Sequence, residues 1–180
     1  KNSKGQGPSW ANSLFEDNAE HGLGLYLGQK VLREQAINSL TACVSSDKAS
    51  AEFKAAYEKF MATKDDTREN SATVKALLPF VEAAAANGCA DAIEVLDKKQ
   101  YLSKKSVWIF GGDGWAYDIG FGGLDHVLAS GENVNVMVFD TEVYSNTGGQ
   151  ASKASNIGEV CQFAAAGKEI GKKSLAEIAM

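Results

Sequence analysis

Two short segments in the second half of the chain carry the side chains best suited to chemistry. Gly112-Asp113-Gly114 follows an apolar run, and Thr141 opens a polar stretch, residues 141–150, that follows a second apolar run. Asp113 provides a carboxylate, Thr141 provides a hydroxyl, and the second segment adds main-chain carbonyls. Mg²⁺ binds about six such oxygens in an octahedral array and usually takes several of them from phosphate and water. The residue types therefore favour a site for Mg²⁺ and a diphosphate.

The chain around these two segments is predicted to form a βαβ unit. Residues 106–110 and 134–139 have the β-branched and aromatic content of short buried strands. Between them, Asp118 is expected to cap a helix that ends at Ser130-Gly131. The apolar residues at helical spacing on this helix are Ile119, Leu124, Val127 and Leu128. Strand, helix and strand in this order predict two parallel strands in an α/β fold.

This topology brings the two loops together. Parallel strands open their carboxyl ends onto one edge of the sheet, so we expect Asp113 and Thr141 to approach each other. The helix that begins near Asp118 would turn free N–H groups toward an anion. Gly112 and Gly114 would let the backbone approach that anion closely.

The two loops allow two other interpretations. Asp-Gly is common in turns, and the string Gly-Gly-Asp-Gly alone is weak evidence for phosphate binding. The second loop is unusually long for a connector, which favours a ligand site. A dinucleotide site is not favoured, because the glycines do not follow the GxGxxG spacing.

The segment at residues 111–155 reads GGDGWAYDIGFGGLDHVLASGENVNVMVFDTEVYSNTGGQASKAS. It resembles the thiamine-diphosphate-binding segment of the pyruvate:ferredoxin oxidoreductase (pyruvate synthase) family. Residues 7–20, GPSWANSLFEDNAE, and 163–168, FAAAGK, also resemble this family, so the resemblance covers nearly the whole chain and is loosest over 29–105. Ferredoxin oxidoreductases for other 2-oxoacids share a Gly-Asp-Gly loop and a Thr-Gly-Gly-Gln ending, but the amino-acid sequence of their second loop is usually different.

The resemblance implies an α/β fold, a parallel sheet flanked by helices, that binds thiamine diphosphate and Mg²⁺. It implies that the side chains of Asp113 and Thr141 and the main-chain oxygen of Val143 bind the metal. Asn146 would face the thiazolium ring and pyruvate, where its amide suits an oxyanion or a carboxylate; alternatively, it caps the tight turn that follows. The cofactor-binding residues implied by the two matching loops are Gly112, Asp113, Gly114, Trp115, Thr141, Glu142, Val143, Tyr144, Ser145 and Asn146.

The resemblance also implies a reaction. The family decarboxylates pyruvate oxidatively, forms acetyl-CoA from coenzyme A, and passes electrons through iron–sulfur clusters to ferredoxin or flavodoxin in anaerobic metabolism. The cluster cysteines and the glutamate that activates the cofactor are expected outside this chain, which we interpret as a section of one domain of a larger, homodimeric enzyme. The alternatives are a fused pyruvate:NADP oxidoreductase, another 2-oxoacid:ferredoxin oxidoreductase, and a noncatalytic Mg²⁺-diphosphate-binding module.

We expect three parts: an N-terminal segment (1–28), a helical insertion (29–105) and the βαβ core (106–180). Breaks between the helices of the insertion are predicted at 45–47 and around 65–70. Three apolar stripes define its helices: Leu32, Ala36, Leu40 and Cys43; Phe53, Ala56, Tyr57, Phe60 and Met61; Val74, Leu77, Leu78 and Val81. The third helix would be kinked or cut at Pro79 and end at Asn87-Gly88, before a shorter helix at 91–96. The insertion carries no recognisable chemistry, so we expect it to have a packing or interface role.

Composition excludes several classes of function. The chain has a net charge of −5 and no apolar run long enough to span a membrane, so neither nucleic acid nor membrane is an expected partner. Cys43, Cys89 and Cys161 match no metal-binding spacing and are interpreted as ordinary thiols of a reducing compartment, either the cytoplasm or a hydrogenosome-like organelle. His21 and His126 are the two histidines of the chain, and neither is expected to be catalytic. Trp10 and Trp115 are expected either to line the pocket or to fill the core.

Overall fold

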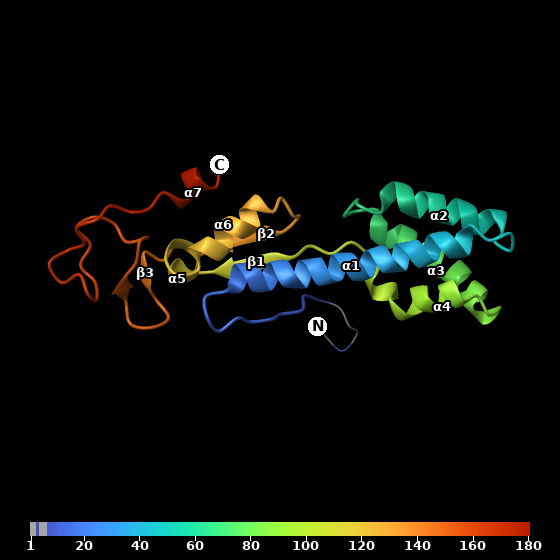
Figure 1. The fold of residues 1–180 in the computed structure, drawn as a ribbon, viewed down its shortest axis with the longest axis horizontal. Helices are drawn as coiled ribbons and strands as arrows, with labels where there is room; N and C mark the ends of the chain where they lie inside the picture. Colours follow the sequence, from blue (N-terminus) through green and yellow to red (C-terminus); the bar gives the residue numbers. More distant parts are fainter. Residues whose placement is uncertain (1–2, 4–6) are drawn as a thin grey trace. The chain divides into compact units, whose positions relative to one another are not determined.

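The computed structural model describes residue 3 and residues 7–180, and the chain divides into two compact units (Figure 1). One unit takes in the chain up to Leu25 together with Val107–Met180, and the other is Tyr26–Ser106. The elements are helices α1 (Asn18–Val44), α2 (Ala51–Thr63), α3 (Asn70–Ala86), α4 (Ala90–Asp97), α5 (Asp113–Tyr117), α6 (Phe121–Ala129) and α7 (Leu175–Ile178), the 3₁₀ turn η1 (Lys99–Tyr101), and strands β1 (Trp108–Gly111), β2 (Asn135–Val138), β3 (Val143–Tyr144) and β4 (Gln150–Ala151).

The unit Tyr26–Ser106 is helical, as the apolar stripes predict. Its helices pack around a core that includes Leu40, Phe60 and Leu77, all fully buried. Ser50 caps α2, because its hydroxyl accepts a hydrogen bond from the N–H of Phe53 at 3.2 Å. The predicted breaks around 45–47 and 65–70 are confirmed by the ends of α1, α2 and α3.

The third helix of this unit ends where the sequence predicts but is not cut at the proline. Asn87 caps the C-terminus of α3, and Gly88 follows with φ of +82°, a conformation that glycine adopts readily. A break at Pro79 is wrong, since α3 continues through it. Leu77 and Val81 are buried on either side of the proline, so packing holds both halves of the helix in place.

The other unit is built on the predicted parallel strand pair. β1 and β2 are parallel, with Ile109 opposite Val136. Ile109 packs in a core with Leu23 of α1 and with Leu124 and Val127 of α6. The predicted α/β class, with a parallel sheet flanked by helices, is therefore confirmed (Figure 1).

The expectation that both strands are buried holds for only one face of the pair. Side chains alternate along a strand, so Ile109 faces the core while its neighbours face the other way. Large apolar side chains remain exposed on that second face: Trp108, Phe110, Met137 and Phe139. The aromatic content identified strands correctly but did not distinguish one covered face from two.

The predicted helix start at Asp118 is wrong. The chain turns into α5 already at Asp113, and the N–H of Ala116 donates to the carbonyl of Gly112 at 3.1 Å. Trp115, Ala116 and Tyr117 are buried, and this packing outweighs the poor helix propensity of the neighbouring glycines.

The chain then turns again before α6 begins at Phe121. Ile119, which was expected on the buried side of a helix, lies in this turn and is 81% exposed, and Leu128 on α6 is also exposed. Leu124 and Val127 are buried as expected, and α6 ends at Ala129, followed by its C-cap Ser130 and by Gly131 at φ of +65°. The carboxylate of Asp118 caps no helix; it accepts from the N–H of Lys153 and pairs with the ammonium of that residue.

The second polar loop contains a small hairpin. β3 and β4 are antiparallel, with Tyr144 opposite Gln150. The turn between them closes through the N–H of Gly149, which donates to the carbonyl of Tyr144 at 2.9 Å. Over residue 3 and residues 7–180, no helix is long and apolar enough to span a membrane.

Candidate active site

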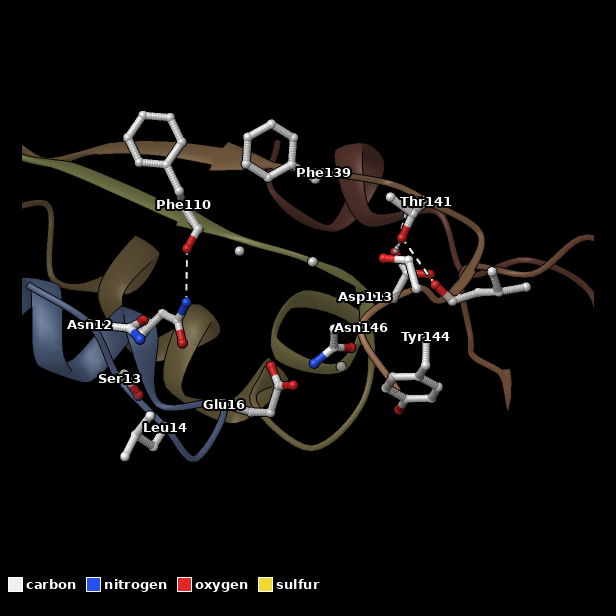
Figure 2. Close-up of a pocket in the computed structure, with 16 residues that line it drawn as sticks. Asn12, Ser13, Leu14, Glu16, Phe110, Asp113, Phe139, Thr141, Tyr144 and Asn146 are labelled. Carbon is white, nitrogen blue, oxygen red and sulfur yellow. Dashed lines mark hydrogen bonds between the residues drawn. The ribbon is translucent and has the colours of Figure 1, made fainter. Parts of the chain in front are cut away.

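A pocket of about 650 Å³ opens at the carboxyl ends of β1 and β2 (Figure 2). Its walls come from the first glycine loop, from the β3 hairpin and from a segment near the N-terminus. The residues that line it are Asn12, Ser13, Leu14, Glu16, Asn18, Phe110, Gly111, Gly112, Asp113, Gly114, Phe139, Thr141, Val143, Tyr144, Ser145 and Asn146.

Asp113 and Thr141 meet at this edge of the sheet, as the topology predicts. The N–H of Thr141 donates to Oδ1 of Asp113 at 3.0 Å, and the hydroxyl of Thr141 lies 3.4 Å from the same oxygen (Figure 2). The hydroxyl of Ser152, which sequence reasoning missed, donates to Oδ2 at 3.0 Å. Both carboxylate oxygens are thus held in place before any ligand binds.

The Asp113 carboxylate is buried, at 3% exposure, and no ion pair with it is seen among the described residues. Burial raises the pKa of this carboxyl, while the hydrogen bonds from Ser152 and Thr141 act in the opposite direction. The neighbouring negative charge of Asp140 raises the pKa further. A buried carboxylate in this setting is stabilised by a cation, which the pocket can admit.

The spacing of the oxygens fits Mg²⁺. The hydroxyl of Thr141 lies 3.4 Å from Oδ1 of Asp113 and 3.0 Å from the main-chain oxygen of Val143. In an octahedral magnesium site with metal–oxygen distances of about 2.1 Å, adjacent oxygens lie roughly 3 Å apart. A carboxylate, a hydroxyl and a carbonyl are also the hard oxygen donors that this ion prefers. The donor set therefore fits the metal that the resemblance implies.

The pocket wall near Gly114 leaves room only for a residue without a side chain. A Cβ at this position would lie 2.7 Å from Cε1 of Tyr144 and 3.0 Å from Oε1 of Glu16. Gly114 therefore lets the first loop and the hairpin lie close together at the pocket.

Sequence reasoning missed most of the wall formed near the N-terminus. Glu16 adopts a left-handed backbone conformation, with φ of +59°, and the next turn leads into α1. The amide of Asn18 donates to the carbonyl of Phe110 at 2.8 Å, which ties this segment to β1. Ser13 contributes a buried hydroxyl with no partner among the described residues. The resemblance of residues 7–20 to the family was the only signal that could have indicated this wall.

Two residues assigned to the cofactor do not line the pocket. Trp115 is fully buried in the core, so of the two roles considered for this indole the structure shows core packing. Glu142 has φ of +68°, and its carboxylate pairs with Lys172 at 3.3 Å. The two histidines, His21 and His126, are exposed and also lie outside the pocket lining.

A polar cluster outside the pocket lining supports the second loop. The hydroxyl of Tyr117 donates to Oδ2 of Asp140 at 2.9 Å, and the ammonium of Lys172 pairs with the same carboxylate at 2.7 Å. Burial and the hydrogen bond to Asp140 raise the pKa of Tyr117 to about 12. These contacts fix Asp140, which directly precedes the proposed metal ligand Thr141.

Asn146 lines the pocket from the exposed tip of the hairpin (Figure 2). In the adjoining turn, the N–H groups of Gly148 and Gly149 donate to the carbonyl of Tyr144, and the hydroxyl of Thr147 donates to Gln150. The amide of Asn146 is thus placed where a bound ligand can reach it, and its role toward substrate stays a prediction.

Comparison with known families places this site in a class. Residues 80–180 match the thiamine pyrophosphate enzyme family, C-terminal TPP binding domain. The chain belongs to this family, and the predicted thiamine diphosphate site is thereby supported at the level of the domain.

Individual relatives indicate the family more specifically than the domain match does. The chain is 53% identical to the pyruvate:ferredoxin oxidoreductase of Moorella thermoacetica and 50% identical to the pyruvate-flavodoxin oxidoreductase of Klebsiella pneumoniae, over 99% of its length in both cases. It is 44% identical, again over 99% of its length, to the mitochondrial pyruvate dehydrogenase [NADP(+)] of Euglena gracilis. The chain covers 16%, 15% and 10% of these three proteins, respectively. The resemblance inferred from the sequence motifs is confirmed.

Proposed function

We propose that this chain forms the diphosphate- and Mg²⁺-binding part of an enzyme that decarboxylates pyruvate oxidatively and forms acetyl-CoA and CO₂. The observation that carries the proposal is the group of three oxygens from Asp113, Thr141 and Val143 at the end of two parallel strands. Relatives at about half identity over the whole chain are named for pyruvate oxidation with ferredoxin or flavodoxin, which supports the same substrate here.

In this proposal the residues of the chain bind and orient, and the cofactor supplies the electronic chemistry. Thiamine diphosphate, when bound, provides an electron sink for the loss of carbon dioxide from a 2-oxoacid. Asp113, Thr141 and the carbonyl of Val143 would hold Mg²⁺, whose charge would offset the negative charges of the Asp113 carboxylate and of the diphosphate. Gly112, where an added Cβ would meet only the main-chain oxygen of Phe139 at 3.9 Å, leaves space for the diphosphate beside the first loop.

Asn146 is proposed to position the substrate. Its amide both donates and accepts hydrogen bonds and carries no charge, so it can contact either the carboxylate or the keto oxygen of pyruvate. A neutral donor aimed at an oxygen that gains negative charge contributes on the order of 10²-fold to 10³-fold to the rate of such reactions.

The remaining parts of the reaction are proposed to lie in the rest of a larger polypeptide. These include the glutamate that activates the cofactor, the cysteine ligands of iron–sulfur clusters, the coenzyme A site and the contact with ferredoxin or flavodoxin. We further propose a homodimeric enzyme in the cytoplasm or in a hydrogenosome-like organelle.

The electron acceptor has a specific alternative. The similarity to the NADP(+)-dependent enzyme of Euglena gracilis extends over the same 99% of the chain, so these residues do not decide between the acceptors. Reduction of ferredoxin, flavodoxin and NADP⁺ by the full polypeptide, assayed side by side with pyruvate and coenzyme A, tests this choice. A preference for NADP⁺ would assign the protein to the fused type.

The variant Asn146→Ala, made in the full polypeptide, tests whether the protein catalyses a reaction or only binds the cofactor. We expect pyruvate-dependent reduction of the acceptor to fall about 10²-fold, with the affinity for thiamine diphosphate unchanged. Asn38→Ala, on an exposed position of α1, is the matched control and should keep full activity. A wild-type protein that binds thiamine diphosphate and Mg²⁺ but oxidises no 2-oxoacid would instead support a noncatalytic module.

A further inference from the structure

Two cysteines that are distant in sequence meet in the helical unit. Cys43 lies in the last turn of α1, and Cys89 directly precedes α4, where it occupies the N-cap position. The thiol of Cys89 donates to the sulfur of Cys43, with the two sulfurs 3.3 Å apart. The sequence spacing predicts ordinary core or surface thiols, and this interpretation does not account for their contact.

The contact is suited to a covalent bond. A disulfide requires sulfurs about 2.05 Å apart, so the two sulfurs must approach each other by little more than about 1 Å to form the bond. Cys89 adopts an extended conformation at the start of α4, with φ of −73° and ψ of 111°. Its N–H donates to the carbonyl of Ala84 at 3.1 Å and its carbonyl accepts from the N–H of Ile93 at 3.2 Å, so its backbone is held and closure relies mainly on side-chain rotation. Rotation of the Cys89 side chain and a small backbone adjustment can therefore bring the sulfurs together.

We propose that Cys43 and Cys89 are a redox-modifiable pair that forms an internal disulfide on reaction with a low-molecular-weight disulfide. The sulfur of Cys89, once deprotonated, attacks one sulfur of the oxidant, and the other sulfur leaves as a thiolate. The sulfur of Cys43 then loses its proton and attacks the sulfur of Cys89, which releases the second thiolate. Two protein thiols are oxidised to one disulfide, and one small disulfide is reduced to two thiols.

The exposure of the two thiols determines which of them reacts first with the oxidant. Cys89 is partly exposed, whereas Cys43 is 4% exposed, so a small oxidant reaches Cys89 first. Burial, followed by the contact with Cys89 and the charge of Asp91, raises the pKa of Cys43 to about 12. Only a small fraction of Cys43 is therefore thiolate at neutral pH, which makes it a slow second nucleophile rather than the first.

The bond would have a defined mechanical effect. It would join the end of α1 to the start of α4 and enclose α2 and α3 in a covalent loop. Closing a loop of this length restricts the unfolded chain, so the disulfide form should resist unfolding of the helical unit more than the dithiol form. The pair lies outside the pocket lining, and the proposal does not depend on the proposed function.

The test is peptide mapping of the full polypeptide after native incubation with oxidised glutathione, followed by alkylation of the remaining thiols in denaturant. Trypsin releases Cys43 in residues 34–48 and Cys89 in residues 76–98, and Cys161 in residues 154–168 reports whether the oxidant has acted elsewhere. We expect peptides 34–48 and 76–98 to be linked, and the link to disappear on reduction with dithiothreitol.

Two variants assign the roles of the sulfurs. Cys43→Ser should leave Cys89 as a stable mixed disulfide with glutathione, whereas Cys89→Ser should leave Cys43 alkylated as a free thiol. Cys161→Ala should form the link as wild type does. The proposal is overturned if the link forms only after denaturation, if either cysteine pairs with another part of the polypeptide, or if both stay free while Cys161 becomes glutathionylated.

Discussion

The main-chain N–H of Thr141 donates a 3.0 Å hydrogen bond to Oδ1 of Asp113 and so joins the ends of two parallel strands. This bond makes the metal-binding geometry a consequence of the β1–β2 register. A shift of one residue in that register would displace one strand end along the other by about 3.3 Å and separate the two groups. The proposed ligands are therefore positioned by the sheet rather than by the metal.

The hydroxyl of Thr141 can be tested apart from its N–H. Thr141→Val keeps the main-chain donor to Asp113 and the shape of the side chain but removes an oxygen ligand. We expect the affinity for Mg²⁺ in the presence of thiamine diphosphate to fall about tenfold or more, equivalent to about 1.4 kcal/mol. Thr141→Ser retains the oxygen and should stay within a few-fold of wild type. Equal Mg²⁺ titrations for Thr141→Val and wild type would exclude the hydroxyl as a ligand.

Ser152 is predicted to support the site indirectly. Ser152→Ala removes the donor to Oδ2 of Asp113 and leaves this buried oxygen without its partner, at a cost of about 1–3 kcal/mol. Loss of such a partner behind a metal ligand lowers metal affinity by roughly 10-fold to 100-fold. Ser130→Ala, which removes an exposed hydroxyl donor at the end of α6, is the control. Ser152→Ala with wild-type Mg²⁺ affinity would contradict this role.

Two glycines near the start of α6 should respond to alanine in opposite ways. A Cβ at Gly120 would lie 2.4 Å from the main-chain oxygen of Glu16, so Gly120→Ala should destabilise the protein by about 1–3 kcal/mol. Gly122 has no atom within 4 Å of such a Cβ and lies within α6. Gly122→Ala should therefore stabilise the protein by about 0.5–1 kcal/mol. Denaturant unfolding of both variants checks the signs, and a stabilising Gly120→Ala would refute the close contact with the N-terminal segment.

Cys43 should make stability depend on pH in the alkaline range. Its folded-state pKa of about 12 exceeds the usual value of 9.0, because the thiol is buried and hydrogen-bonded with Cys89. The folded protein therefore keeps a proton that the unfolded chain releases, and the free energy of unfolding falls as pH rises from about 9 to about 12. Cys43→Ala should show a smaller decrease over this range when unfolding is measured under reducing conditions. An identical decrease in both proteins would show that the thiol is not protected by burial.

The parts of the site that follow from a topological rule could be predicted from sequence. Parallel strands end at one edge, so the meeting of Asp113 and Thr141 was foreseen without knowledge of side-chain packing. The start of α5 was not foreseen, because the helix propensity of the glycines beside Asp113 is poor and the burial of Trp115 is decided by the whole core.

Contacts between segments that are distant along the chain follow no comparable rule that can be recognised in the sequence. Glu16 reaches the pocket from nearly a hundred residues before the first loop, and only its membership of a family-like block marked it. Cys43 and Cys89 are separated by 46 positions and follow no recognised spacing. Their contact depends on how α1 and α4 pack, and helical periodicity predicts the helices but not which of their ends meet.

In the proposed function, Asp113 anchors Mg²⁺ for a bound diphosphate. Asp113→Asn preserves size and can still accept the hydrogen bond from Thr141, but it removes the only carboxylate among the three proposed ligands. The Ser152 hydroxyl must then accept from the new amide instead of donating to Oδ2, and removal of the buried charge offsets the lost bond, so the unfolding midpoint of the metal-free protein should stay close to that of wild type.

The decisive measurement is calorimetric titration of the full polypeptide with thiamine diphosphate, with and without Mg²⁺, for wild type and Asp113→Asn. Mg²⁺ should strengthen binding to wild type by at least about 100-fold, and the variant should lose this enhancement while remaining folded. A folded Asp113→Asn protein with the same Mg²⁺-dependent gain in affinity as wild type would contradict the account.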